Sequence, residues 1–342
     1  MTVIAEEDIK YMKRCLQLAR CGEVGAPPNP MVGAVIVHGG EIIGEGYHIR
    51  CGGPHAEVNA IASVKDESLL PKSTIYVSLE PCAHYGKTPP CADLIVKKQI
   101  PRVVIGCQDP FAKVNGLGIR KLKDAGIDVT VGVLEDECLW LNRRFVTFHQ
   151  KKRPWVTLKW AQSQNGYMDA GHGSGEKATL FSTPFTQTLV HRMRAMNKAV
   201  MVGTNTALYD NPSLTTRLWS GDNPLRITID RHDVLPKTLH IMDGTVPSQI
   251  YRNADLREIL SDLYERNVQT LMVEGGAKLL ESFISEGLWD EARVETAPFE
   301  LFHGVRAPSI QQMRLLSEGV FDARKIQTFI PQNSRRVNEK RM

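Results

Sequence analysis

One histidine and two cysteines limit the fold of this chain more than any other feature. His55 precedes Glu57 by two residues, a Pro-Cys pair ends at Cys82, and another cysteine follows at Cys91. One imidazole and two thiolates can occupy three positions of a tetrahedral zinc site and leave the fourth open for water. A fold that uses this site must bring three separate segments of the chain to one point.

Strand-like and helix-like segments alternate through the first part of the chain. Apolar, β-branched runs predict strands, and apolar residues at helical spacing predict helices. Such alternation predicts a three-layer α/β/α sandwich in which His55 and Cys91 stand at helix starts, where the helix dipole stabilises thiolates. The expected strands span residues 32–37, 41–47, 74–79, 102–106 and 127–133, and the expected helices span 7–20, 56–64, 92–98 and 119–124.

The α/β alternation starts again after a basic stretch that ends at Pro154. We therefore expect two domains, residues 1–150 and 151–342, which also suits a chain of 342 residues. Expected strands of the second domain span 156–160, 198–202, 225–230, 270–273 and 292–296, and its expected helices span 184–196, 254–266 and 277–284.

Composition excludes several classes of protein. An apolar content of 42% and a charged content of 23% are ordinary for a soluble globular chain. A net charge of +4 gives no case for a nucleic-acid surface, and no apolar run reaches the roughly 18 residues of a membrane span. The N-terminus lacks the pattern of a signal peptide. We expect a cytoplasmic protein in which clustered cysteines bind metal rather than form disulfides.

The residue types around His55 indicate hydrolytic chemistry. Zinc in an open site activates water at neutral pH, and a nearby glutamate such as Glu57 can move the protons. Zinc deaminases of nucleobases carry H-x-E followed by P-C-x-x-C. Here the second cysteine comes later, after a longer loop. A fourth protein ligand, such as Cys51 or His84, would instead indicate a structural zinc site.

The first half resembles the bifunctional deaminase/reductase family of riboflavin biosynthesis. The similar motifs are PNPMVGA at 28–34, GYH at 46–48, PHAE at 54–57, LEPC at 79–82 and GKTPPC at 86–91. The resemblance implies zinc-dependent deamination of 2,5-diamino-6-ribosylamino-4(3H)-pyrimidinone 5′-phosphate. It implies zinc ligands His55, Cys82 and Cys91, with Glu57 as the catalytic proton shuttle. It also implies that Asn29 and His48 line the substrate, with Lys87 and Asp109 nearby.

The resemblance continues through the second half, which has no Gly-x-Gly-x-x-Gly dinucleotide motif. The similar motifs are KWAQS at 159–163, LVHRMR at 189–194, GTNTA at 203–207, DNPSLTTR at 210–217, PLR at 224–226 and EGG at 274–276. They imply a dihydrofolate-reductase-like α/β domain that uses NADPH to reduce a ribosyl group to ribityl. The first domain is correspondingly cytidine-deaminase-like.

Residue roles in the second half follow from the same resemblance. The residues implied to face NADPH are Ala161, Thr206, Asp210 and Gly276. Those implied to face the substrate are Arg194, Leu214, Arg217 and Glu274. The two arginines suit a 5′-phosphate because a guanidinium group binds phosphate bidentately.

Three segments depart from the family pattern. Asn165-Gly166 stands where Asp-Gly is usual. The sequence ATLFSTP at 178–184 replaces a Gly-x-Ser-x-Trp-Ile-Thr pattern, so a serine and a tryptophan are absent. The sequence APFELFHG at 297–304 replaces Ala-Pro-x-Leu-Leu-Gly. These departures affect the expected reductase contacts.

Two other hypotheses about the function of this chain remain open. One is a nucleoside or tRNA deaminase with an appended nucleotide-binding domain. The other is a non-catalytic protein with structural zinc and a nucleotide-binding domain. For the two-activity enzyme we expect a small phosphorylated pyrimidine as partner, no nucleic acid or membrane, and a homo-oligomer that is a dimer or a tetramer.

Overall fold

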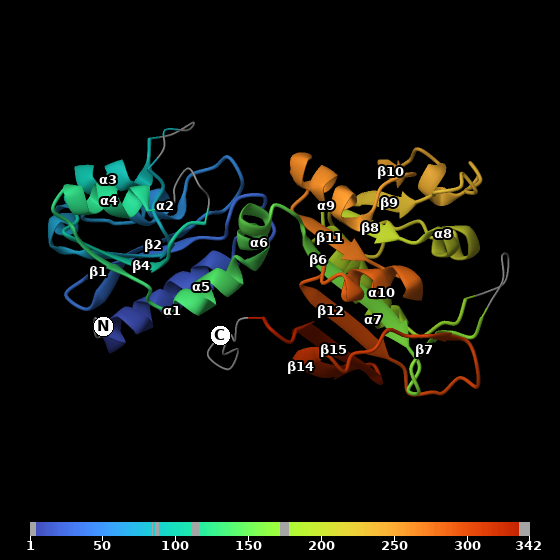
Figure 1. Ribbon diagram of the computed structural model, residues 1–342. Helices are drawn as coiled ribbons and strands as arrows, with labels where there is room; N and C mark the ends of the chain where they lie inside the picture. The colour runs from blue at the N-terminus through green and yellow to red at the C-terminus, as the bar shows by residue number, and fades with distance from the viewer. Residues whose placement is uncertain (1–4, 84, 86–88, 111–115, 172–177, 335–342) are drawn as a thin grey trace. The chain divides into compact units, whose positions relative to one another are not determined.

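A computed structural model describes residues 5–83, 85, 89–110, 116–171 and 178–334. The chain divides into two compact units: one extends to Lys151 and the other begins at Lys152 (Figure 1). Each unit has its own sheet and its own hydrophobic core. Within these described residues, no helix combines the length and apolar character that a bilayer span requires.

The first unit is built on a five-stranded sheet of order β2-β1-β3-β4-β5. The strand β1 pairs antiparallel with both of its neighbours, whereas β3, β4 and β5 run parallel. The parallel strands place their carboxyl ends at one edge, where the loop to Cys82 leaves β3. The strands are β1 (Gly33–His38), β2 (Glu41–Tyr47), β3 (Thr74–Leu79), β4 (Arg102–Cys107) and β5 (Asp128–Val131).

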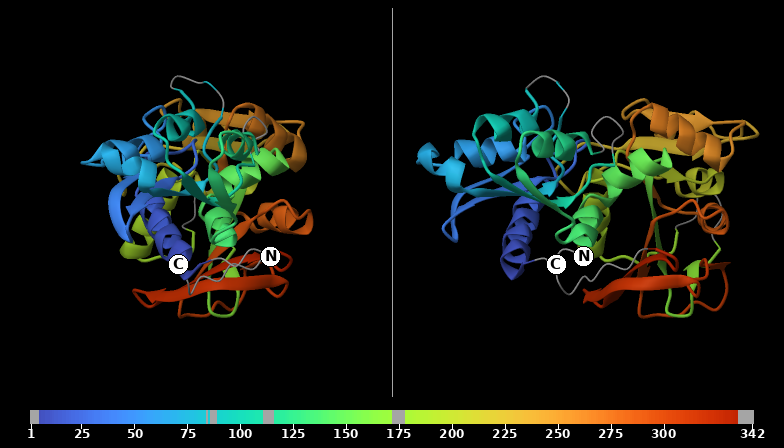
Figure 2. Two further views of the ribbon diagram at one scale, coloured as in Figure 1. Left: turned by 90° about the vertical axis from the view of Figure 1, so that its left-hand side faces the viewer. Right: turned by 60° about the vertical axis from the view of Figure 1, so that its left-hand side comes forward.

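Helices cover both faces of this sheet (Figure 2). Alternate residues along each strand point to opposite faces, so Ile36 packs with one helical layer and Val35 with the other. The first layer holds α2 (Ala56–Ala62), α3 (Cys91–Lys97) and α4 (Leu117–Asp124), and the second holds α1 (Glu6–Arg20) and α5 (Glu135–Leu141). This arrangement confirms the predicted three-layer sandwich. The unit also contains η1 (Glu67–Lys72) and α6 (Arg143–Lys151).

The second unit is built on an eight-stranded sheet of order β10-β9-β8-β11-β6-β12-β15-β14. The first six strands in this order run parallel, and β15 and β14 are antiparallel to their neighbours. Its strands are β6 (Trp155–Gln162), β8 (Ala199–Val202), β9 (Leu225–Ile229), β10 (Ser248–Tyr251), β11 (Thr270–Val273), β12 (Glu291–Thr296), β14 (Met313–Phe321) and β15 (Arg324–Pro331). A separate pair joins β7 (Tyr167–Asp169) to β13 (Val305–Arg306).

Helices of the second unit also pack on both faces of the sheet. The helices α9 (Leu256–Glu265) and α10 (Ala277–Ser285) supply Leu260 and Phe283 to one core. On the other face, Ala207 of α8 (Thr204–Asp210) packs with Val200. The helix α7 (Pro184–Ala195) is tied to β12 by a hydrogen bond from Thr186 to Glu295, 2.7 Å long. A short 3₁₀ helix, η2 (His240–Met242), follows β9.

The structure adds elements that the sequence patterns did not predict. The helices α5, α6 and α8 and the hairpin of β14 and β15 lie outside every expected range. Residues 204–210 contain threonine and asparagine, which favour caps and turns over helix interiors. Burial of Ala207 against the sheet outweighs that local preference. In β14 most side chains are exposed or half-buried, so the strand lacks the apolar signal of a core strand.

Candidate active sites

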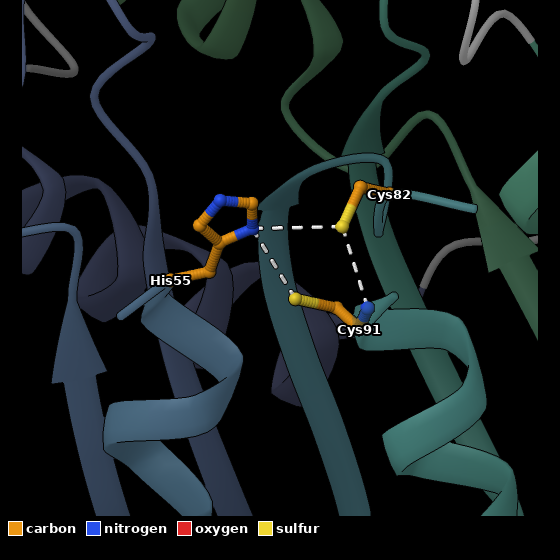
Figure 3. A group of neighbouring side chains, drawn as sticks. All are labelled: His55, Cys82 and Cys91. Atoms are coloured by element: carbon orange, nitrogen blue, oxygen red, sulfur yellow. Dashed lines mark hydrogen bonds between the residues drawn. The ribbon is translucent and has the colours of Figure 1, made fainter. Parts of the chain in front are cut away.

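The three predicted zinc ligands come together at the ends of three elements. His55 is the N-cap residue of α2, Cys91 is the first residue of α3, and Cys82 lies in the loop after β3. The Nδ1 atom of His55 lies 3.5 Å from Cys82 Sγ and 3.4 Å from Cys91 Sγ (Figure 3). Tetrahedral zinc with normal bond lengths places nitrogen and sulfur ligands about 3.5 Å apart. The donor set therefore fits one zinc ion with a fourth position left open.

No other group of histidine, cysteine or acidic side chains among the described residues has this geometry. Cys51 is exposed and is not part of the cluster. His84 and Lys87, which were also considered for this site, lie outside the described residues. Among the described residues, three ligands are grouped, the number expected of a catalytic rather than a structural zinc site.

Hydrogen bonds within the cluster favour one thiolate before any metal binds. The bond from the Cys91 thiol, helped by His55, lowers the pKa of Cys82. The backbone amide of Cys91 also donates to Cys82 Sγ over 3.3 Å. Because its proton is held by Cys82, the pKa of Cys91 is raised. Zinc binding would release this second proton.

Glu57 lies in the first turn of α2 and is only 3% exposed. Burial, together with the negative charge of Cys82, raises the pKa of its carboxyl group to about 7. A carboxyl group with a pKa near neutrality can both accept and deliver a proton during turnover. Its environment therefore suits the predicted role of proton shuttle.

His48, one of the two residues predicted to line the substrate, lies beside the zinc ligand His55, and the other, Asn29, contacts His48. The His48 ring contacts the His55 ring edge-on, with 5.4 Å between ring centroids. His48 Nδ1 lies 3.0 Å from the Pro54 carbonyl oxygen, which can only accept, so this nitrogen carries the proton. His48 Nε2 then accepts from the Asn29 amide over 3.1 Å. Burial lowers the pKa of His48, which favours this neutral tautomer.

Two buried polar residues that support this site were not predicted. Asn142 accepts from the Met31 amide over 2.8 Å and donates to the Met31 carbonyl over 2.9 Å, which fixes the loop that carries Asn29. Glu80 accepts from four backbone amides, including those of Asp109 and Gly118, and so anchors the start of α4 near Cys82. Both roles depend on contacts between distant segments, so no local pattern reveals them.

The second unit contains a cavity of about 330 Å³. Four residues that were predicted to face NADPH or substrate line it: Ala161, Arg194, Arg217 and Glu274. Lys159 and His191 also line the cavity and were not singled out by the sequence. Burial lowers the pKa of Lys159, against the opposing effect of the Glu274 charge.

The two arginines of the cavity have different partners. Arg194 forms a bidentate ion pair with Glu274, 2.6 and 2.7 Å long, and donates to the Thr215 carbonyl over 3.1 Å. Burial alone would raise the pKa of Glu274, but the Arg194 charge lowers it. Arg217 is exposed, and within the described part of the chain its side chain has one hydrogen-bond contact, 3.4 Å long, with the Thr215 hydroxyl. Arg217 therefore has more donors available for an anionic ligand.

The other predicted contacts, Thr206, Asp210, Leu214 and Gly276, are not among the residues that line this cavity. A side chain at Gly276 would place its Cβ 3.1 Å from the hydroxyl of Thr206, so the two residues are close neighbours. Asp210 ends α8. Leu214 is 1% exposed and packs with Leu235 in the core rather than facing the cavity.

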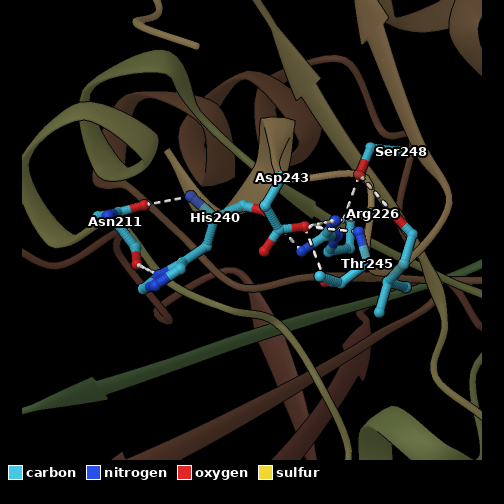
Figure 4. A network of polar contacts seen from close by, with 7 residues as sticks. Asn211, Arg226, His240, Asp243, Thr245 and Ser248 are labelled. Atoms are coloured by element: carbon cyan, nitrogen blue, oxygen red, sulfur yellow. Dashed lines mark hydrogen bonds and ion pairs between the residues drawn. The ribbon is translucent and has the colours of Figure 1, made fainter. Parts of the chain in front are cut away.

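A polar network holds the segment that follows α8 (Figure 4). The fully buried Arg226 donates to the His240 carbonyl over 2.7 Å and to Asp243 over 2.9 Å. His240 contacts Asn211 twice: its amide donates to Asn211 Oδ1, and its Nδ1 lies 2.7 Å from the Asn211 carbonyl oxygen. Asn211 has a φ of +41°, an unfavourable value for a residue with a side chain. The network thus fixes the turn that leads to Arg217.

Comparisons with known proteins match both units. The family model described as the RibD C-terminal domain matches residues 154–332, and that of the cytidine and deoxycytidylate deaminase zinc-binding region matches residues 5–107. The riboflavin biosynthesis protein RibD of Aquifex aeolicus is 38% identical over 319 residues, which cover 86% of this chain and 88% of that protein. The chain belongs to the RibD family.

Other members of the RibD family agree along nearly the whole chain. The RibD of Bacillus amyloliquefaciens is 38% identical over 327 residues, covering 88% of this chain and 86% of that protein. The solved structure of Acinetobacter baumannii RibD (form 1) has a TM-score of 0.84 at 34% identity and covers 95% of this chain and 99% of that one. A Thermotoga maritima deaminase/reductase structure has a TM-score of 0.82 at 34% identity, with the same coverage.

Membership of the RibD family confirms the predicted fold class and the combination of a deaminase with a reductase. The zinc-binding family model confirms zinc as the metal of the first unit. Because the match spans both units, it favours the two-activity enzyme over a nucleoside or tRNA deaminase with an appended domain.

Arg217→Ala is expected to raise the substrate KM of the reductase about 10- to 100-fold, because hydrogen bonds to a charged group contribute roughly 1.5–3 kcal/mol each. Ammonia release should be unchanged, and steady-state NADPH oxidation measures the effect. Arg192→Ala is the matched control, since Arg192 lies on α7 near the ring of Trp219 and does not line the cavity. An equal KM rise in both variants would contradict the assignment of Arg217.

The second unit is expected to lose stability in mild acid because of His191. Burial, with the charges of Arg194 and Arg217, lowers the pKa of His191 to about 4, below the unfolded value. The unfolded chain therefore binds more protons between about pH 6.5 and 4, and the free energy of unfolding should fall by roughly 1–3 kcal/mol across that window. His191→Gln should flatten the dependence.

Urea unfolding followed by tryptophan fluorescence measures this effect, because four of the five tryptophans lie in the second unit. His232→Gln, at an exposed histidine, is the control. An unchanged pH dependence in His191→Gln would contradict the prediction.

Proposed function

We propose that this chain catalyses two successive steps of riboflavin biosynthesis. The first is hydrolytic deamination of 2,5-diamino-6-ribosylamino-4(3H)-pyrimidinone 5′-phosphate. The second is NADPH-dependent reduction of 5-amino-6-(5-phosphoribosylamino)uracil to its ribitylamino product. The observation that supports this proposal most directly is that His55, Cys82 and Cys91 come together next to the buried Glu57. The similar Thermotoga maritima protein, a diaminohydroxyphosphoribosylaminopyrimidine deaminase/5-amino-6-(5-phosphoribosylamino)uracil reductase, supports the choice of substrates.

In the deaminase, His55, Cys82 and Cys91 would hold zinc, which lowers the pKa of water and so supplies a nucleophile near neutral pH. Glu57 accepts the two protons of the water in turn, delivering the first to the ring nitrogen and the second to the departing amine. The ring carbon gains oxygen from water, loses its amino group and becomes a carbonyl, and ammonia leaves. Asn29 and His48 orient the ring.

In the reductase, C1 of the open-chain sugar receives a hydride from NADPH, and a proton completes the reduction. Arg217 binds the 5′-phosphate, and the Arg194–Glu274 ion pair contacts the substrate in the same cavity. Ala161, Thr206, Asp210 and Gly276 form the NADPH side. The protein here supplies position and charge complementarity, because the cofactor carries the chemistry.

The quaternary structure and location are further parts of the proposal. We infer a homo-oligomer, a dimer or a tetramer. The edge strand β14 supports it, because this strand leaves Leu315, Val320 and Phe321 exposed. Light scattering of the purified chain tests this inference, and a monomer would contradict it. All seven cysteines are free thiols, which supports a reducing compartment such as the cytoplasm.

The test of the proposal is a two-signal assay of the purified chain with the diaminopyrimidinone phosphate. Ammonia release is expected without NADPH, and NADPH oxidation is expected only once ammonia has formed. Absence of ammonia release from zinc-loaded protein would overturn the deaminase assignment. Failure to oxidise NADPH with the deaminated phosphate would overturn the reductase assignment.

A further inference from the structure

The three segments that depart from the family pattern contact one another in the second unit, and one of them, 178–184, lines the cavity. Phe181 comes from the altered segment 178–184 and Phe299 from the altered segment 297–304. Their rings are stacked, with centroids 5.5 Å apart and an interplanar angle of 10°. Phe181 lines the cavity and is only 4% exposed. Phe181 is therefore an apolar part of the cavity wall, and Phe299 stacks on it without lining the cavity itself.

The third departure, Asn165, holds this wall in place. Its Nδ2 donates to the Leu301 carbonyl over 2.8 Å, and its Oδ1 accepts from the Leu301 amide over 3.2 Å. Ser163 fixes the orientation of this amide group: its hydroxyl accepts from the Tyr167 amide, so its own proton goes to Asn165 Oδ1 over 2.7 Å. Asn165 thus binds both polar backbone groups of Leu301, two residues beyond Phe299.

An aspartate at this position could not make both bonds. A carboxylate accepts hydrogen bonds but has no proton to donate, so the Leu301 carbonyl would lose its partner and face a negative charge. The neighbouring backbone supports the same placement, since the Gln164 amide donates to the Phe299 carbonyl over 2.8 Å. The asparagine in place of the usual aspartate therefore accords with the altered segment that it holds.

We propose that Asn165 is a positioning residue of the reductase, which acts by holding Phe299 against Phe181. The ring of Phe181, held by Phe299, is an apolar part of a cavity that cationic and acidic side chains also line, so it suits the face of a flat heterocycle. Two such rings enter the reaction, the pyrimidine of the substrate and the nicotinamide of NADPH. This inference rests on the proposed reductase function of the cavity.

The test compares Asn165→Asp, Phe299→Ala and the double variant by steady-state NADPH oxidation, with the KM of each ligand measured separately. Each single substitution is expected to raise the KM of one ligand about three- to tenfold, the size expected for loss of one stacked aromatic pair. The ligand affected identifies the ring that lies on the wall. The KM of the double variant should not exceed the higher of the two single-variant KM values, because Asn165 acts through Phe299. Ammonia release should stay within twofold of wild type.

Arg306→Ala is the matched control. Arg306 lies over the Tyr167 ring at 4.1 Å and donates to the Asn165 carbonyl, so its loss weakens the pairing of β13 with β7 but leaves both bonds to Leu301. It should lower the melting temperature without raising either KM. Unchanged KM values in the single variants, additive effects in the double variant, or an equal KM rise in Arg306→Ala would each overturn the inference. Failure of the wild-type chain to oxidise NADPH would instead overturn the proposed function.

Discussion

Replacing Glu57 by glutamine is expected to lower the kcat of ammonia release by about 10²- to 10⁴-fold, the contribution typical of a positioned acid–base group. The amide has nearly the same shape, so it fills the same buried position at the start of α2, but it cannot accept the proton of water. Zinc content should remain at one equivalent, because Glu57 is not among the three grouped ligands. Elemental analysis and a coupled ammonia assay measure the two quantities.

Two controls separate the loss of chemistry from a loss of folding. Glu45 lies on β2 in the same unit, where its carboxylate pairs with Arg14 of α1 and is not among the grouped zinc ligands. Glu45→Gln should therefore keep full activity. In Glu57→Gln itself, NADPH oxidation with the deaminated phosphate should continue at the wild-type rate. If deamination survives in this variant, Glu57 is not the proton shuttle.

Replacing Cys91 by serine is expected to remove zinc and, with it, more than 99% of ammonia release. A serine hydroxyl is a poor zinc ligand, and loss of one of three ligands leaves too few donors for tight binding. Cys91 is also buried at the first position of α3, so its sulfur cannot be replaced by a neighbouring cysteine without moving the helix. NADPH oxidation with the deaminated phosphate should be unaffected.

Cys51→Ser is the matched control for this substitution. Cys51 is an exposed cysteine close to His55 in the sequence but outside the cluster, so its variant should keep both zinc and deaminase activity. Zinc loss in Cys51→Ser would show a fourth protein ligand and point to a structural metal. Full zinc content with normal ammonia release in Cys91→Ser would exclude Cys91 as a ligand.

The zinc site was predictable because its signals are local. His55 and Glu57 lie within one helical turn, and Cys82 and Cys91 each stand at the end of an element whose pattern is clear in the sequence. The same reasoning could not find Asn142, whose two bonds to Met31 join distant segments of the first unit. Such contacts depend on the finished fold, and asparagine before a helix has many ordinary local uses.

The reductase cavity shows a different limit of sequence reasoning. The sequence placed Arg194 and Arg217 together as phosphate ligands, and nothing local distinguishes them. The fold does, because Glu274 at the end of β11 reaches the guanidinium group of Arg194 and leaves Arg217 with its donors available. Leu214 was similarly expected near the substrate, but its backbone turns the side chain into the core.

The most direct test of the whole account is the order and ratio of the two reactions in one sample. Purified zinc-loaded chain is mixed with the diaminopyrimidinone phosphate and NADPH, and ammonia and NADPH are followed together. We predict that NADPH oxidation begins after a lag and ends at one NADPH per ammonia released. NADPH oxidation that precedes ammonia release, or ammonia release that no NADPH oxidation follows, would contradict two successive activities in this chain.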